Sequence, residues 1–163
     1  MSEPYPPSLK SWGKSVLVGG SAAGILSIVP FVNLLNLFFM FWIAAGAALT
    51  VHLIIRQNRE IRVSDSLISG AMSGLIAGII FAALTLISFL QINQEKFAEL
   101  VEKARTLYPG MDSETASVLQ SGHFKIILVI IVSVFVILSI VAGSLAGMIA
   151  RYVFMRSAGK SNG

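Results

Sequence analysis

The sequence predicts an all-α integral membrane protein, and three long segments without charged residues are the main reason. No Asp, Glu, Lys or Arg occurs in residues 15–55, 66–94 or 126–150. Only 12% of the 163 residues are charged, whereas soluble domains average about 25%. About 20 apolar residues suffice for a helix to cross a bilayer, and a soluble core does not need three such runs in so short a chain. We therefore interpret residues 1–163 as one integral membrane domain.

The first charge-free segment is long enough for two helices. As a single helix it would measure about 60 Å, twice the thickness of the hydrocarbon core. Pro30, Asn33 and Asn36 suit a turn, because proline lacks a backbone donor and asparagine tolerates turn geometry. We expect a first span at about 12–32 and a second at about 36–56. A re-entrant loop, whose broken backbone must be buried in protein, is the rival interpretation.

Two further spans and one connection complete the predicted topology. The third span, at about 64–92, follows the motif RVSDS, in which Ser64 or Asp65 is suited to cap the helix. The fourth span, at about 124–151, ends in the motif ARYVFMR. Residues 93–123 connect these two spans outside the membrane. The predicted fold is thus a four-transmembrane-helix bundle with a short helical extramembrane connection.

The connection is predicted to contain two short helices. Phe97 and Leu100 belong to an apolar set at helical spacing, with charged residues on the opposite side, and Pro109 is a stop signal. A second helix is expected at 113–120. Because an amphipathic face needs only something apolar beneath it, the connection either lies against the membrane surface or the bundle, or docks a partner.

The distribution of Lys and Arg predicts that both termini are cytoplasmic. With the N-terminus inside, the inner segments hold eight of these residues, whereas the outer segments hold four, accompanied by five acids. Basic residues are enriched on the cytoplasmic side of membrane proteins. The expected location is therefore the cytoplasmic membrane of a bacterium, with an N-in and C-in arrangement.

Small residues recur every four positions in the spans and are predicted to form the helix contacts. In lipid, packing contacts supply much of the association between helices, and glycine lets two backbones approach closely. The similar patterns in spans one, three and four fit either an internal duplication or convergence on one packing rule. Since the bulky aromatic residues lie toward the other side, the helices are expected to be closest at the cytoplasmic end. The predicted packing residues are Gly20, Gly24, Gly46, Gly70, Gly74, Gly78, Gly143 and Gly147.

The spans contain no constellation that is typical of catalysis. His52 is the one ionisable residue in their charge-free parts, and a single histidine without further ligands or carboxylate neighbours makes neither a metal site nor a proton relay. The absence of cysteine excludes thiolate sites, and no phosphate-binding glycine loop is present. We expect no enzyme activity, no cofactor and no metal. A possible polar site consists of His52, Asn33 and Asn36.

Three segments suggest a relationship: AAGILSIVPFVNLLN in the first hairpin, RVSDSLISGAMSGLIAG at the third span, and INQEKFAELVEKA with PGMDSETA in the connection. In their order they resemble small, uncharacterised four-span membrane proteins of bacteria. Such families carry no known activity. The resemblance therefore implies the architecture and no catalytic residue.

Two functions remain open from the sequence. The first is a structural or accessory subunit, whose partners are the lipid bilayer and either other membrane subunits or further copies of the chain, without nucleic acid. The second is a small channel or transporter for a neutral or lipidic solute. A water-filled path lined by hydroxyls, Asn33, Asn36 and His52 would favour the second function, and a continuous apolar core would favour the first.

Overall fold

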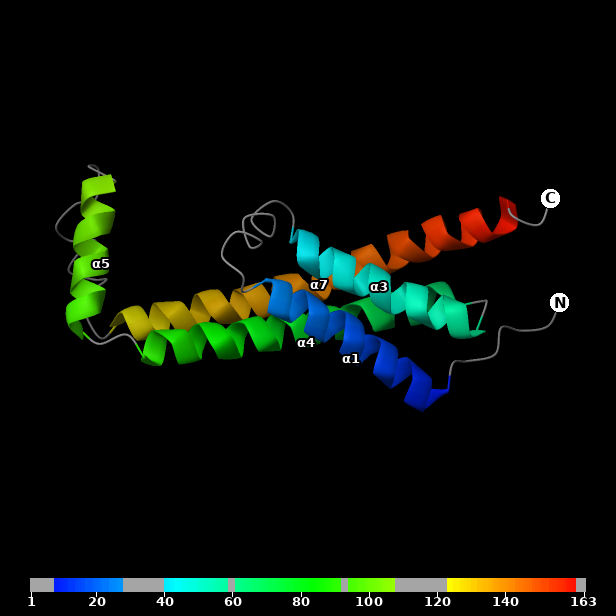
Figure 1. Ribbon diagram of the computed structural model, residues 1–163, viewed down its shortest axis with the longest axis horizontal. Helices are drawn as coiled ribbons and strands as arrows, with labels where there is room; N and C mark the ends of the chain where they lie inside the picture. The colour runs from blue at the N-terminus through cyan, green and yellow to red at the C-terminus, as the bar shows by residue number, and fades with distance from the viewer. Residues whose placement is uncertain (1–7, 28–39, 59–60, 92–93, 108–122, 161–163) are drawn as a thin grey trace. The chain divides into compact units, whose positions relative to one another are not determined.

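The computed structural model describes residues 8–27, 40–58, 61–91, 94–107 and 123–160 of the chain. These residues form helices and short turns, which confirms the prediction of the all-α class (Figure 1). Within these ranges the helices are α1 (Leu9–Leu26), α3 (Phe41–Asn58), α4 (Val63–Leu90), α5 (Gln94–Leu107) and α7 (His123–Lys160).

The chain divides into two compact units, which are described separately. The bundle unit comprises Met1–Ala82 and Phe135–Gly163, and therefore contains α1, α3, the first part of α4 and the last part of α7. The connection unit comprises Ala83–Val134, with the end of α4, α5 and the start of α7.

α1 covers less of the chain than the predicted first span. It begins at Leu9 rather than near residue 12. It ends at Leu26, where the N–H and the hydroxyl of Ser27 both donate to the Ala23 carbonyl, at 3.0 and 2.8 Å. Such a bond from a serine hydroxyl satisfies one of the carbonyls that a helix end leaves free. The predicted turn residues Pro30, Asn33 and Asn36 lie outside the described residues.

α3 begins at Phe41, five positions after the predicted start of the second span. The N–H groups of Ile43 and Ala44 both donate to the Met40 carbonyl at 3.0 Å, which marks Met40 as the residue that precedes the helix. Met40 has a φ of 51°, in the left-handed region. A residue other than glycine in that region costs about 1–2 kcal/mol, so the surrounding packing holds it there.

The prediction that Ser64 or Asp65 caps the next helix is wrong. The N–H of Ser66 donates to the Arg62 carbonyl at 3.1 Å, so α4 begins at Val63 and Arg62 occupies the cap position. Asp65 lies in the first turn instead. Its negative charge is favourable there, because the free N–H groups give a helix start a partial positive charge.

α7 is longer than the predicted fourth span. It has 38 residues and continues to Lys160, beyond the predicted end at residue 151. Nothing in its last part breaks a helix, because no proline occurs there and the basic residues Arg151 and Arg156 favour the helical state.

Two helices are long and apolar enough to cross a membrane, namely Val63–Phe89 within α4 and Ile126–Arg156 within α7. Only 22% and 17% of their apolar windows are buried, whereas the core helix of a soluble protein is mostly buried. Phe41–Gln57 is a shorter apolar helix. Within the described residues, α1 is not among these candidates, although its 18 residues include only two charged ones, Lys10 and Lys14.

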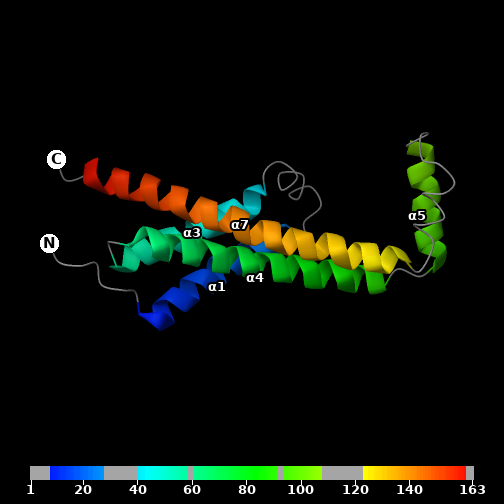
Figure 2. The same ribbon diagram turned by 180° about the vertical axis from the view of Figure 1, so that it is seen from behind.

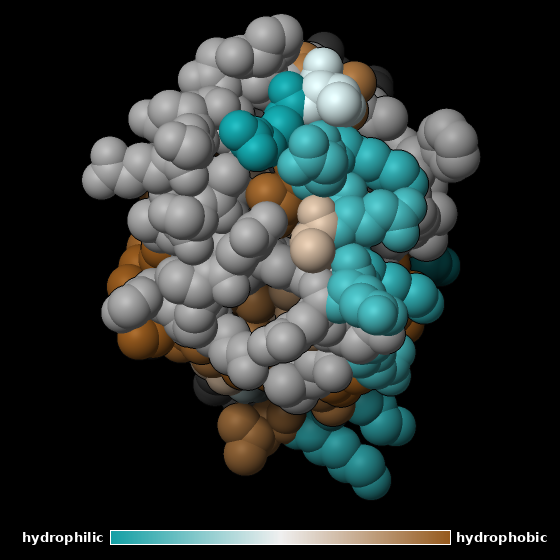
Figure 3. All heavy atoms as spheres, turned by 90° about the vertical axis from the view of Figure 1, so that its left-hand side faces the viewer, coloured by the Kyte–Doolittle hydropathy of each residue, from teal (hydrophilic) through white to brown (hydrophobic). Residues whose placement is uncertain are grey.

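The connection unit contains α5, and the prediction of a helix there is confirmed. Of the predicted apolar face, Val101 is buried, whereas Leu100 is 51% and Leu107 75% exposed. Figure 3 views the side on which α5 lies and shows hydrophilic side chains gathered in one column. The predicted second helix at 113–120 lies outside the described residues.

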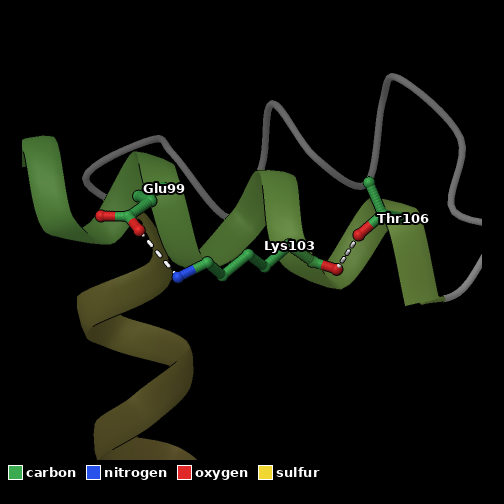
Figure 4. A network of polar contacts seen from close by, with 3 residues as sticks. All are labelled: Glu99, Lys103 and Thr106. Carbon is green, nitrogen blue, oxygen red and sulfur yellow. Dashed lines mark hydrogen bonds and ion pairs between the residues drawn. The ribbon is translucent and has the colours of Figure 1, made fainter.

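An exposed polar network runs along α5 (Figure 4). Lys103 Nζ lies 2.7 Å from Glu99 Oε1, and the Thr106 hydroxyl donates to the Lys103 carbonyl at 2.7 Å. The hydrogen bond from Lys103, together with its charge, lowers the pKa of Glu99. Because both side chains are more than 60% exposed, this ion pair contributes little to stability.

The core of the bundle unit draws on each of the four helices described in it. Ala23 of α1, Ile43 of α3 and Ala77 of α4 are each 1% exposed and pack together. Phe135 of α7 packs against this cluster. Figure 2 shows the last part of α7 beside α3 and the first part of α4. Two of these four core residues are alanines, which let the helices come close together.

Candidate functional site

Within the bundle unit, α4 and α7 touch backbone to backbone through glycines. A Cβ built on Gly70 would meet the Gly143 carbonyl and lie 3.1 Å from the Gly147 Cα. A Cβ on Gly74 would lie 2.9 Å from the carbonyl carbon of Ser139. Real Cβ atoms are essentially never found under 3.0 Å, so only glycine fits at Gly70 and Gly74. The residue numbers rise along α4 as they fall along α7, and the two helices are therefore antiparallel.

Gly78 lies at the looser end of the same contact. A Cβ there would lie 3.2 Å from both the Val136 Cα and the Ser139 Cβ, a distance that a small shift of the neighbours can relieve. One turn further along, the rings of Phe81 and Phe135 pack with their centroids 4.3 Å apart. The contact between α4 and α7 thus changes from glycine against glycine to ring against ring.

α1 and α3 form a second close contact. A Cβ on Gly46 would lie 2.5 Å from both the Ala23 Cβ and the Gly19 carbonyl oxygen. The Thr50 hydroxyl lies within hydrogen-bond distance of two carbonyls, 3.0 Å from Gly46 of its own helix and 3.3 Å from Ser15 of α1. Early residues of α1 face late residues of α3, so these helices are also antiparallel.

α1 and α4 form the third contact and run parallel. A Cβ on Gly20 would lie 2.8 Å from the Ser73 carbonyl oxygen, and a Cβ on Gly24 would lie 2.9 Å from the Ile80 Cβ. Near the start of both helices, the Trp12 indole Nε1–H donates to the Ser69 hydroxyl oxygen at 2.7 Å. This hydrogen bond joins the N-terminal parts of the two helices.

Basic residues gather at one end of the bundle unit. α1 and α4 begin at this end while α3 and α7 finish there, because the helices alternate in direction. Arg151 Nε donates to the Ile61 carbonyl at 2.6 Å and so ties the end of α7 to the residues before α4. The same end carries Lys10 on α1, Arg56 on α3 and Arg156 on α7.

The buried polar groups of this unit are hydroxyls. Most of them donate to a carbonyl of their own helix, as Ser139 does to Phe135 at 2.7 Å and Ser69 to Asp65 at 2.5 Å. Ser73 is the exception among the described residues, because its Oγ is buried and has no hydrogen-bond partner. The set with 2% exposure or less comprises Ser15, Ser27, Thr50, Ser66, Ser69, Ser73 and Ser139.

Of the predicted polar site, only His52 lies among the described residues. His52 is half-buried and its ring lies 4.8 Å, between centroids, from that of Phe154. Asn33 and Asn36 lie outside the described residues. Within the described part of the chain, no three His, Cys, Asp or Glu residues form a group that could hold a metal ion.

Sequence reasoning missed three residues that carry these contacts. Gly19 meets α3 while its neighbour Gly20 meets α4, and the adjacent pair was a usable signal because successive helical positions point about 100° apart. Trp12 and Arg151 make their bonds to residues far along the chain. No spacing rule in the sequence pairs residues so distant.

Comparisons with protein-family models, with curated proteins and with solved structures give no match. What the chain does is therefore inferred from its packing, its exposed surface and its charge distribution.

Proposed function

We propose that the chain is a non-enzymatic, four-span protein of the bacterial cytoplasmic membrane that serves as a structural or accessory subunit. In this proposal α1, α3, α4 and α7 all cross the bilayer. Both termini lie in the cytoplasm, and α5 lies outside.

The observation that carries the proposal is the reversed arrangement of small and large side chains. In the bundle unit the glycines of α4 and α7 face other helices of the same chain, and the serines Ser66, Ser69, Ser73 and Ser139 are buried. Large apolar side chains such as Ile68, Val141 and Leu145 are more than half exposed. Exposed apolar surface on this scale is costly in water, whereas the same surface is at no disadvantage in contact with lipid. In lipid, close packing of small residues stabilises the contacts between helices.

The alternation of helix direction supports four crossings and the proposed orientation. Because the four helices run alternately up and down, the start of α1 and the end of α7 lie on the same side of the bundle unit. That side carries Lys10, Arg56 and Arg156, and the positive-inside rule assigns it to the cytoplasm.

The glycine contacts also limit how a partner binds. Gly20, Gly74 and Gly143 already face helices of the same chain. A partner subunit is therefore expected to use the outer, lipid-facing sides of the helices. In this proposal the glycines hold the subunit together and do not form its docking surface.

Single-cysteine labelling tests the topology directly, because the chain contains no cysteine. Ser8→Cys, Thr106→Cys and Arg156→Cys would each be treated in intact cells with a maleimide that does not cross the inner membrane. We expect labelling of the variant at position 106 alone, and labelling of the other two after permeabilisation. Labelling of position 8 or 156 in intact cells would overturn the orientation.

Gentle extraction from native membranes tests the accessory role. The full chain, solubilised in a mild detergent, is expected to elute with other membrane subunits in a complex larger than its own oligomers. A preparation that contains only copies of this chain would contradict the accessory role and favour the channel.

One observation favours a small channel as the second candidate. Ser73 Oγ is buried without a hydrogen-bond partner, and an unpaired buried hydroxyl costs about 1–3 kcal/mol unless water reaches it. A proteoliposome swelling assay with glycerol separates the candidates. Swelling that is faster than in empty liposomes, and that Ser73→Val abolishes, would support a channel, whereas equal rates support the accessory role.

A further inference from the structure

An open apolar groove lies between α3 and α7 on the surface of the bundle unit. Its volume is about 380 Å³, and it is lined only by alanine, valine, isoleucine and phenylalanine. Ala45 and Ala48 line it on α3, and Ala146 and Ala150 line it on α7. The alanines leave space between two neighbouring helices where larger side chains would meet.

The groove has an apolar end and a basic end. α3 and α7 run in the same direction here, so Phe41 lies at the apolar end and Phe154 at the other end. The His52 ring packs on Phe154 at this second end, with the ring centroids 4.8 Å apart. Arg56 follows His52 by one helical turn, about 6 Å further along α3.

The charges beyond this second end are not neutralised within the described chain. Arg56 and Arg156 are both exposed. Among the described residues, neither guanidinium has an acidic partner. An occupant with an apolar body and an anionic head would therefore complement the groove along its whole length.

The size of the groove selects the kind of occupant. A second helix, about 10–12 Å across with its side chains, would fill about 1,000 Å³ over the length of this groove. The groove's volume is near 380 Å³, which accommodates a hydrocarbon chain, whereas a second helix could insert only side chains into it. The lining also offers no polar group that could orient a polar ligand.

We propose that this groove seats one acyl chain of an anionic phospholipid, whose phosphate lies beside Arg56 and Arg156. This inference rests on the proposed membrane location of the chain. It adds a lipid site that neither the accessory role nor the channel requires. The bound lipid fills the space between α3 and α7 that the small alanine side chains leave open.

Lipid binding to the full-length protein tests the headgroup contact. Phosphatidylglycerol and phosphatidylcholine would be titrated separately into the detergent-solubilised chain, and bound lipid counted by native mass spectrometry. We expect phosphatidylglycerol to bind more tightly. Arg56→Gln should weaken it about fivefold, the usual effect of one basic residue near an anionic lipid. Lys10→Gln, which removes an equal charge at the same end on α1, should change binding less than twofold.

A groove-filling variant tests the acyl-chain contact. Ala45→Leu adds bulk to an exposed lining position, and Ala83→Leu adds the same bulk to an exposed position of α4 outside the groove. We expect the first variant alone to reduce binding of both lipids, with the helix content of both variants unchanged by circular dichroism. If Ala45→Leu misfolds, Arg56→Gln at the exposed end still decides the proposal.

Two results would overturn the inference while leaving the proposed function intact. They are equal affinity for the two phospholipids, and unchanged binding in both Arg56→Gln and Ala45→Leu. Release of the chain from membranes by alkaline carbonate would instead overturn the membrane location itself, and the lipid site with it.

Discussion

The two parts of α4 differ in burial although both are rich in apolar residues. In the bundle unit, Ser66, Ser69, Ser73 and Ala77 recur at spacings of three or four and are buried. In the connection unit, none of the described side chains of residues 83–89 is buried. The first part is thus a packing surface, whereas the second part leaves apolar side chains such as Leu84 and Ile87 exposed.

α7 repeats the same division and shows its cause. Gly143 and Gly147 of the bundle unit touch α4 backbone to backbone. Ile126, Ile130 and Ile131 of the connection unit are each more than half exposed. Apolar content therefore does not decide which part of these helices packs. The spacing of small residues does, because it sets how closely two backbones can approach.

The largest expected effect comes from filling the glycine contact. Gly74→Leu would drive a side chain into the Ser139 backbone, which cannot move aside without separating α4 from α7. We expect a loss of more than about 3 kcal/mol in unfolding free energy, at the upper end of overpacking effects. The measurement is thermal unfolding in a mild detergent, followed by circular dichroism and by size exclusion.

Two matched variants make this test specific. Ala83→Leu places the same side chain on the exposed part of α4, and Gly13→Leu replaces a glycine whose added Cβ would meet nothing within 4 Å. Both should stay within about 0.5 kcal/mol of the parent, the usual range for such surface changes. If Gly74→Leu and Ala83→Leu have equal melting temperatures, the two parts of α4 do not differ in packing as we infer.

A smaller effect ranks the glycines within the bundle unit. Gly19→Ala would place a Cβ against the Gly46 carbonyl and the Thr50 hydroxyl, and should destabilise the protein by about 1–3 kcal/mol. Gly78→Ala meets neighbours only at 3.2 Å. That strain is offset by the gain of about 1 kcal/mol in helix propensity. Urea unfolding should therefore show that Gly19→Ala is the less stable of the two variants. If Gly78→Ala is less stable instead, the close approach of the backbones is not the controlling factor.

Buried polar contacts supply the next test of the bundle unit. The Trp12–Ser69 bond joins α1 to α4 and is partly buried. Trp12→Phe and Ser69→Ala, measured singly and together in a double-mutant cycle, should show a coupling of about 1 kcal/mol. A coupling near zero would mean that the apolar surfaces set the register of α1 on α4 without this bond.

The positions of the helix contacts can be predicted from the sequence pattern. Which two helices meet at each contact depends on residues that are far apart in the chain. The eight glycines singled out by their spacing all lie at contacts between different helices. Spacing finds such positions because one glycine per turn makes a continuous flat stripe. It cannot tell which helix the stripe meets, since Gly20 and Gly24 meet α4 whereas Gly46 meets α1.

Helix ends were harder to predict than helix faces. The prediction that Ser64 or Asp65 caps α4 is wrong because the Arg62 carbonyl already accepts the first backbone hydrogen bond of the helix. Side-chain capping preferences contribute only about 1 kcal/mol, and tertiary contacts outweigh them. The bond from Arg151 to the neighbouring Ile61 carbonyl is one such contact, and it joins residues too far apart in the chain for local rules to foresee.

The smallest expected effect lies in the connection unit, where the Glu99–Lys103 pair is exposed to solvent. The hydrogen bond from Lys103 and its charge lower the pKa of Glu99. A carboxyl group whose pKa is lower in the folded state than in the unfolded state stabilises the fold at pH values above the unfolded pKa, which is near 4.3. This contribution is lost as the pH falls through the folded pKa.

Carbon-13 NMR titration of the Glu99 carboxyl should show that Lys103→Ala raises the pKa of Glu99 toward the ordinary value, and that 1 M salt does much the same in the parent protein. Because the pair is exposed, the melting temperature of Lys103→Ala at pH 7 should equal that of the parent. A clear decrease would mean that α5 depends on this pair as the bundle unit depends on its buried contacts, and the contrast between the two units would then weaken.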